Sequence, residues 1–209
     1  MATQTVTANR STQDLPPEQK VRAVQEAFAD APDAGKVALK NILKDLKSEL
    51  ASRTGVRTES AGRIGLRNGK VSELTLIAPF APGGAERLRT VLNMLDGDFR
   101  GAEKVGTVHD MRFVFLDNDT KMLFATAYDG DFDPYIDDFG TKIPDYMDVV
   151  FTAFEGWPGI RSPQIKDWIA AHMVPAAAWY VASPNLTVAD TRRLEKVGKA
   201  VDELLDKVA

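Results

Sequence analysis

Among its 209 residues the chain contains no cysteine. This absence excludes disulfide bonds, thiolate metal sites, iron–sulfur clusters and a cysteine nucleophile. It is also what we expect of a protein from a reducing cytoplasm. Histidine is almost as scarce, because His109 and His172 are the only two. Any metal ion held through imidazole must therefore use one of these two side chains.

Long apolar runs and an excess of basic residues are also absent. The N-terminal residues carry no apolar signal core, and no run approaches the roughly 20 apolar residues of a membrane span. The net charge is −4 and the isoelectric point is about 5.3, so nothing predicts attraction to nucleic acid or to an anionic membrane. With 44% hydrophobic and 27% charged residues, the composition is typical of a globular protein in the cytoplasm.

Sequence motifs for two further classes of chemistry are missing. The glycine-containing stretches GRIGLRNG and PGGAER lack the Gly-Lys-Ser/Thr ending of a phosphate-binding loop. The chain also has neither a serine nucleophile elbow nor a histidine-rich cluster, so hydrolase and metalloenzyme functions have little support. We therefore predict no metal site.

The first 60 residues predict a tail followed by helices. Residues 1–14 are polar, which predicts a mobile tail. Residues 15–60 are predicted to form a helical segment. Pro16 and Pro17 are expected to begin its first helix, and Pro32 to end it. A second helix follows, with one apolar stripe at helical spacing formed by Leu39, Ile42, Leu43, Leu46 and Leu50. These helices are expected to pack on the following domain or on another subunit.

Residues 61–209 alternate between strand and helix patterns. Asn68–Gly69 predicts a hairpin turn, and a strand with alternating apolar residues follows it. The predicted elements after that strand are a helix at 85–95, strands at 111–115 and 122–128 joined by the turn 117–120, a helix near 134–139, a strand at 149–154, a helix at 164–173, an apolar strand near 177–182 and a C-terminal helix. In that last helix, residues Thr187 or Asp190 can cap the N-terminus. Its apolar stripe consists of Leu194, Val197, Val201 and Leu204.

This order predicts an α+β fold with a ferredoxin-like antiparallel sheet and helices on one face. The other face, expected to carry Phe, Met and Leu side chains, then needs a cover. A second sheet from another subunit or an internal repeat is the usual solution in this architecture.

Three stretches, TVHDMRFVFLDNDTKMLFATAYDGDFDPYIDDF, FEGWPG and VPAAAWYVASPNLTVAD, resemble a bacterial family of the dimeric α+β barrel superfamily. Its wider relatives include the haem-binding dye-decolourising peroxidases and the chlorite dismutases. The resemblance spans roughly residues 70–205 and implies a homodimer or a higher homo-oligomer. Dye-decolourising peroxidases carry a Gly-x-x-Asp-Gly motif, and Thr126–Gly130 (TAYDG) keeps its Asp129 and Gly130 but not its first glycine. The resemblance thus implies that Asp129 is a catalytic, proton-handling acid.

The two histidines are the candidate haem ligands. His172 ends a predicted helix, where Asp167 is a candidate orienting acid; the alternative is that it caps helix carbonyls or fills a partly buried position. His109 lies at a strand entry beside Asp110, and its alternative is an ordinary histidine at the surface or a strand edge.

A row of carboxylates and a set of aromatic residues each have two interpretations. Asp129, Asp131 and Asp133 have the spacing of a calcium loop, but Pro134 and Gly140 replace residues that such a loop needs, so helix capping is favoured. Core packing is favoured over a ligand cavity for the aromatic residues Tyr128, Tyr135, Tyr146, Trp157, Trp168, Trp179 and Tyr180.

Two functional hypotheses follow. In the first, the chain is a homo-oligomeric α+β barrel protein with an apolar cavity between sheet and helices. It binds haem through His172 or His109 and acts as a peroxidase-like oxidoreductase. In the second, the chain is cofactor-free and either binds a small apolar ligand or serves as an assembly module, with its N-terminal helices mediating oligomerisation. The missing motif glycine favours the second hypothesis.

Overall fold

A computed structural model describes residues 15–52 and 58–208. The chain divides into two compact units, Met1–Gly55 and Val56–Ala209. The predicted mobile tail at residues 1–14 lies outside the described residues. The second unit begins before the predicted boundary at residue 61, because Glu59 and Ser60 already belong to its sheet.

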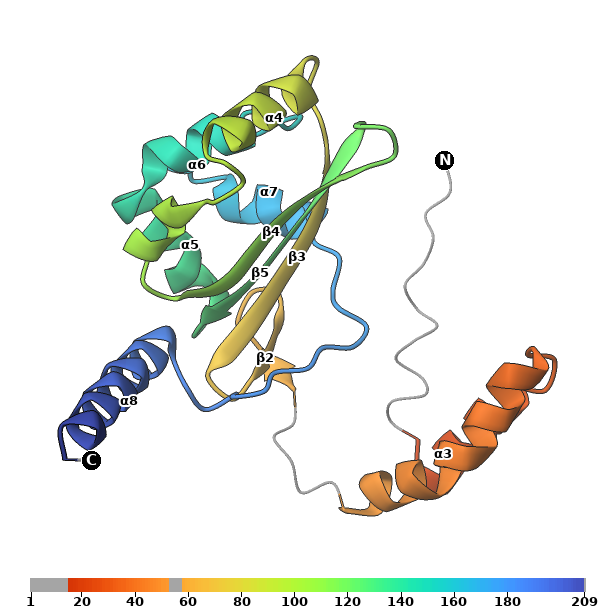
Figure 1. Cartoon of the computed structure of the whole chain (residues 1–209). Helices are drawn as coiled ribbons and strands as arrows, with labels where there is room; N and C mark the ends of the chain where they lie inside the picture. Colours follow the sequence, from red (N-terminus) through yellow and green to blue (C-terminus); the bar gives the residue numbers. More distant parts are fainter. Residues whose placement is uncertain (1–14, 53–57, 209) are drawn as a thin grey trace. The chain divides into compact units, whose positions relative to one another are not determined.

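The first unit is a pair of helices, α2 (Pro17–Ala27) and α3 (Asp33–Ser52), as the proline positions predict (Figure 1). Pro17 stands in the first turn of α2, where its missing N–H has no helical partner to lose. Val21 of α2 and Leu39 of α3 are buried, whereas Ile42 on the predicted stripe is 48% exposed.

The second unit is built on a five-stranded antiparallel sheet with the order β1-β2-β3-β5-β4. Its strands are β1 (Glu59–Ser60), β2 (Leu66–Asn68), β3 (Val71–Pro79), β4 (Val108–Leu116) and β5 (Lys121–Asp129). Gly69 has a φ of +63° in the turn between β2 and β3, and Asp117, Asn118 and Asp119 all have positive φ between β4 and β5. Both predicted hairpins are confirmed. Their turns use glycine, aspartate and asparagine, which tolerate positive φ better than other residues.

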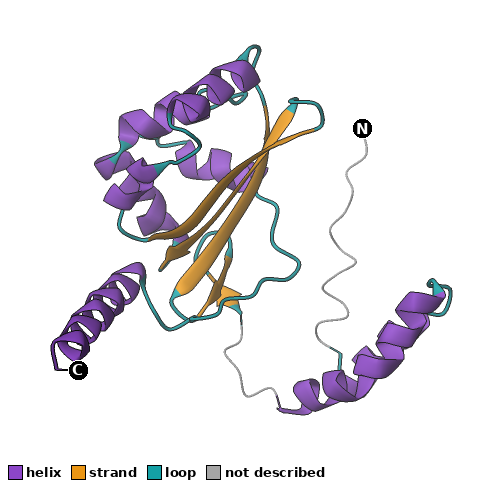
Figure 2. Ribbon diagram, viewed as in Figure 1, coloured by secondary structure: helices purple, strands orange, loops and turns teal. Residues whose placement is uncertain are grey.

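Helices α4 (Gly84–Met94), α5 (Phe132–Lys142), α6 (Pro144–Phe151) and α7 (Ile165–His172) lie on one face of this sheet, which makes the unit an α+β fold (Figure 2). The short 3-10 helix η1 (Arg100–Lys104) leads from α4 towards β4. Aromatic side chains join the two layers: the rings of Phe113, Phe124 and Phe151 contact one another, and Tyr128 stacks on Tyr135 at 3.8 Å. The favoured assignment to the core is confirmed for these two tyrosines, since both are buried, and is wrong for Tyr146 and Tyr180, which are 46% and 85% exposed.

The predicted strand at 149–154 is wrong, because residues 144–151 form helix α6. Pro144 stands in its first turn, and the buried residues Met147, Val150 and Phe151 recur at helical spacing. The apolar run alone did not distinguish the two structures, because three consecutive apolar residues fit a buried strand as well as a buried helix turn.

The predicted strand near 177–182 is also absent. Residues 174–187, which we call the strap, run beside β3 without forming a ladder. The strap is fixed at both ends: Val174 N–H donates to the carbonyl of Thr75, and Lys70 N–H donates to the carbonyl of Pro184. β2 pairs with residues 71–73 of β3, and along the rest of this edge the strap contributes one backbone hydrogen bond, from Val174 to Thr75.

The Phe and Met side chains lie on the helix-covered face rather than on the second face, contrary to the prediction. Met111, Phe113 and Phe115 of β4 pack against the core. The second face carries smaller aliphatic groups instead. Ile77 on β3, Leu123 on β5 and Val114 on β4 pair directly across the three strands, and Val114 is 44% exposed.

Helix α8 (Val188–Val208) follows the strap, and Val188 is its buried residue. The aliphatic side chains of the predicted stripe, together with Leu205 and Val208, are 45% to 72% exposed. This helix therefore keeps its fold through its own backbone and its N-terminal attachment rather than through burial of its apolar face.

Candidate functional site

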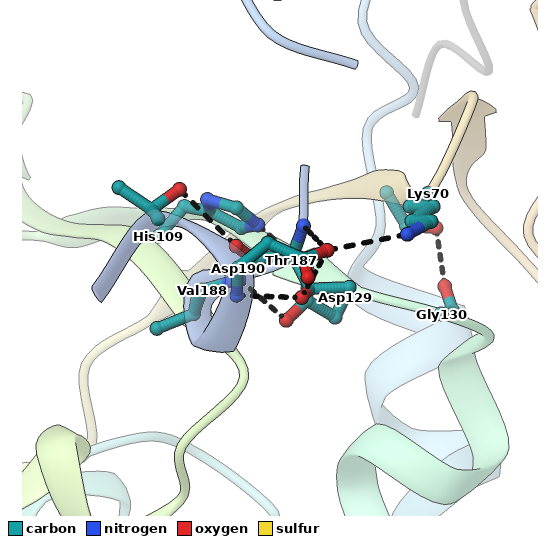
Figure 3. A network of polar contacts seen from close by, with 9 residues as sticks. Lys70, His109, Asp129, Gly130, Thr187, Val188 and Asp190 are labelled. Atoms are coloured by element: carbon teal, nitrogen blue, oxygen red, sulfur yellow. Dashed lines mark hydrogen bonds and ion pairs between the residues drawn. The ribbon is translucent and has the colours of Figure 1, made fainter. Parts of the chain in front are cut away.

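The structure places Asp129 at the centre of a polar network, at the end of β5 (Figure 3). Its Oδ1 lies 2.7 Å from His109 Nε2, and its Oδ2 accepts a hydrogen bond of 3.0 Å from Val188 N–H. The Asp129 side chain is 12% exposed and that of His109 is 23% exposed. Asp129 therefore joins β4 and β5 to the first residue of α8.

The start of α8 carries a reciprocal cap. Thr187 N–H and Oγ1 both donate to the carboxylate of Asp190, and Asp190 N–H donates back to Thr187 Oγ1 at 3.0 Å. Lys70 Nζ contacts the same carboxylate at 3.2 Å. The bonds from Thr187, followed by that from Lys70, lower the pKa of Asp190 to about 2. Both predicted capping residues thus act together, with Asp in the position that Glu or Gln takes in the common capping box.

The His109–Asp129 pair has a defined chemical form. A carboxylate accepts hydrogen bonds, so His109 donates from Nε2, and neutral His109 then keeps an unprotonated Nδ1. A carboxylate that orients an imidazole in this way is common beside metal ligands and general bases. Here, however, the second oxygen of the same carboxylate is bonded to the α8 backbone. The arrangement thus anchors a helix as well as orienting an imidazole.

His172 lies elsewhere, at the end of α7. Its Nδ1 bonds to the carbonyl of Trp168 at 2.8 Å, and its ring lies 4.1 Å from the Trp168 ring. The next residue, Met173, bridges to the outer edge of β3, whereas His109 is on β4 at the opposite edge of the long strands. The predicted orienting acid Asp167 pairs with Arg63 at 2.7 Å instead.

The acidic row after β5 is neutralised by basic side chains. Asp131 pairs with Arg67 at 2.6 Å, and Asp133 pairs with Arg63 at 3.2 Å. Asp131 occupies the N-cap position of α5 without a side-chain capping bond. In residues 15–52 and 58–208 no cluster of three or more His, Asp or Glu side chains could hold a metal ion. In the same ranges, no helix has the length and apolar character needed to cross a membrane.

Glu73 is a buried carboxylic acid that sequence reasoning missed. It is 4% exposed on β3, and its Oε2 accepts a hydrogen bond from Thr75. Burial raises the pKa of Glu73, although bonds from the Ala176 backbone and Thr75 oppose this effect. The signal in the sequence was a glutamate inside an otherwise apolar strand; only the position of the strap explains why it is covered.

Unsatisfied polar atoms concentrate at this same end of the sheet. Among the described residues, the buried side-chain atoms without a hydrogen-bond partner are Arg67 Nε, Asn68 Oδ1, Glu73 Oε1, Thr107 Oγ1 and Tyr128 Oη. Strand register places them together, because Arg67 pairs with Ser72, Ser72 with Tyr128, and Tyr128 with Val108. Burial and the nearby Glu73 carboxyl raise the pKa of Tyr128, so its hydroxyl stays protonated. The buried polar side chains of the second unit therefore lie together where β2, β3, β4 and β5 meet the strap and α8.

The space between sheet and helices is filled. The hollow among the core residues there measures about 20 Å³, whereas sites for small organic ligands usually measure about 300–1,000 Å³. An apolar surface groove of about 270 Å³ lies between α4 and α6 and includes Met94, Phe99, Tyr146 and Val149; neither histidine lines it. The residues of a single copy thus do not fit a haem enclosed between sheet and helices.

Comparisons with known proteins add no assignment. No protein-family model matches the chain, and neither a curated protein nor a solved structure matches it. The function must therefore be argued from the geometry described above.

Proposed function

We propose that this protein is a cofactor-free assembly module whose α+β unit associates with a second copy through the second face of its sheet. One observation carries the proposal. Ile77, Leu123 and Val114 form an aliphatic row across the three long strands, on the face opposite the helices. Val114 is 44% exposed and the other two are partly exposed, and contiguous apolar area left in water is typical of association surfaces.

The neighbouring rows on this face favour a flat apolar contact. Ala125 of β5 is small, and Asp110 and Arg112 of β4 neutralise each other at 2.9 Å. The contact ends at the row of Ala127, because its neighbour Glu73 is covered by the strap. Two sheets that pack face to face lie about 10 Å apart, with such side chains between them. A second copy would therefore meet an aliphatic centre with a charge-balanced edge.

The connectivity supports a ferredoxin-like assignment as part of this proposal. The long strands stand in the order β3-β5-β4, with α4 between β3 and β4 and the other helices after β5. The strap returns to the outer edge of β3, where the fourth strand of such a fold would pair. Association of two copies through the second face is the solution that this architecture commonly uses.

The test is the mass in solution of the full chain, measured by light scattering after gel filtration. Every chain in this measurement carries Val201→Glu, so that the exposed apolar stripe of α8 cannot join two copies. We expect this chain to have twice the 22.9 kDa of one chain, and the same chain with Leu123→Glu to run as a single chain, because a charge would be buried at the contact. Val149→Glu is the control, since Val149 is 58% exposed on the helical layer. A single-chain mass without Leu123→Glu, or twice the mass with it, would overturn the sheet-face contact.

The cofactor-free part of the proposal has a separate test. We expect no stoichiometric absorption band when the purified chain is mixed with hemin, because the core hollow is too small to admit it. A band at one haem per chain that His172→Ala or His109→Ala abolishes would overturn this part. It would return the protein to the haem-binding, peroxidase-like hypothesis, with Asp129→Ala under peroxide as the next measurement.

A further inference from the structure

Helix α8 exposes an apolar seam that the rest of its unit does not use. The seam consists of Leu194, Val197, Val201, Leu204 and Val208, each at least 45% exposed. Their spacings are 3, 4, 3 and 4 residues, which is the a and d repeat of a coiled coil. A helix that packs on a globular core usually shows a broader stripe with a period of 3.6 residues.

The remaining positions of α8 agree with the same repeat. With Leu194, Val201 and Val208 at a, the b, c and f positions are all charged: Glu195, Lys196, Lys199, Asp202, Glu203 and Asp206. The side of the helix that faces away from the seam is thus entirely charged, and beside the seam only Arg193 and Lys207, both at g, carry charge. This separation is typical of a helix pair in which water reaches only the outer face.

We propose that α8 pairs with α8 of a second copy as a parallel two-stranded coiled coil. The flanking e and g positions select the partner and its direction. In a parallel pair, Ala200 at g faces Leu205 at e of the other helix, so the exposed Leu205 gains a small apolar neighbour. Arg193 at g likewise faces Gly198, around which the structure leaves open space.

An antiparallel pair would be less favourable. There, g positions face g positions, which brings Arg193 of one helix towards Lys207 of the other at both ends of the seam. Like charges at this distance repel, and such contacts set direction in coiled coils. In the second heptad, Val201 at a and Leu204 at d suit parallel dimers, whereas the first heptad has the reverse order, with Leu194 at a and Val197 at d.

The anchor at the base of α8 gives this pairing its place in the molecule. Val188 N–H is bonded to Asp129, and Asp190 to Lys70, so the helix begins at a fixed point of the sheet. In two copies paired through α8, the sheet ends that carry Lys70 and Asp129 would therefore both lie at the N-terminal end of the seam. This contact uses a different surface from the sheet face of the proposed function.

Cysteine crosslinking tests the proposal directly, because the chain has no cysteine of its own. In a parallel pair Leu194 faces its own counterpart, so we expect Leu194→Cys to form a disulfide-linked species of twice the 22.9 kDa chain on mild oxidation. The matched control is Lys199→Cys at the outward f position, which we expect to crosslink far more slowly. Both changes lie on exposed positions, so neither threatens the fold.

Each outcome decides the question. Leu194→Cys that crosslinks no faster than Lys199→Cys would overturn the pairing and leave the seam to another segment or another protein. Crosslinking between Leu194→Cys and Val208→Cys chains, without Leu194 self-crosslinking, would show an antiparallel pair and overturn the direction. Repeating the measurement in Leu123→Glu separates the two contacts: a crosslink that persists there shows that α8 pairs even when the sheet face fails.

Discussion

The attachment of α8 to the sheet gives the sharpest prediction, and Asp129→Ala is the change that tests it. The substitution removes the hydrogen bond from Val188 N–H and the pair with His109. A hydrogen bond to a charged group contributes about 1.5–3 kcal/mol. The partly exposed pair with His109 adds about 0.2–1 kcal/mol. Val188 is the buried residue of α8, whereas the cap of Thr187 with Asp190 and the Lys70 ion pair hold the residues that follow it.

The assay is hydrogen exchange of the backbone amides of residues 188–191. A loss of about 1.5–3 kcal/mol corresponds to exchange that is about 10- to 100-fold faster, since each 1.4 kcal/mol is a factor of ten. We expect this loss at the amide of Val188, which donates to Asp129, and a smaller loss at those of Asp190 and Thr191, which donate to Thr187. The core amides of β3 should stay well protected, because their hydrogen bonds and packing are unchanged.

Asp131→Ala is the matched control, since it removes a neighbouring carboxylate that pairs with Arg67 and does not touch α8. It should leave the amides of 188–191 close to wild type. If Asp129→Ala also leaves them at wild-type protection, Asp129 does not anchor the helix, and the reasoning from its two hydrogen bonds is refuted.

Three further predictions concern titration and packing. Because burial raises the pKa of Glu73, the free energy of unfolding of wild type should fall as pH rises above the ordinary pKa of 4.5. Urea unfolding at several pH values should show a smaller fall in Glu73→Gln. An equal fall in the two proteins would contradict the burial argument. Asp190 should titrate near pH 2, and Thr187→Ala should move the pKa of Asp190 towards 3.8. The NMR chemical shift of the Asp190 carboxyl carbon follows this titration. An unmoved pKa would show that the cap does not cause the low value. A Cβ at Gly84 would collide with the backbone carbonyl oxygen of Ala153, so thermal unfolding should show Gly84→Ala to be less stable by about 1–3 kcal/mol. Gly198→Ala meets open space and should instead gain stability, since alanine is the better helix former.

Much of the second unit followed from local pattern. The turns at Gly69 and at Asp117–Thr120 were predictable because few residues tolerate positive φ, and the helices at 84–94 and 165–172 were predictable from helical spacing. The run at 149–154 was not, because its apolar residues satisfy both periods over so short a length. Proline is favoured in the first turn of a helix, so Pro144 was a sign that α6 starts there. The apolar run after it also fits a strand, and the strand was predicted instead.

The candidate site was only partly predictable. Asp129 and both histidines were found as chemistry-bearing residues, but their partners were not. Asp129 meets His109 because β4 and β5 pair in a particular register, and it meets Val188 only because the strap brings residue 188 back to the sheet. Asp129 and Val188 are 59 residues apart, and no helix or strand period can predict a contact over that separation.

The sequence by itself determined most of the helices, the hairpins and the seam of α8, since each depends on residues within one or two turns of one another. Only the tertiary structure decided which face of the sheet is covered, why Glu73 is buried, and that the expected cavity is filled. Those outcomes depend on how elements far apart in the sequence share one face and one volume: the strap brings the Ala176 backbone to Glu73, and aromatic rings from β4, β5 and α6 fill the space between the layers.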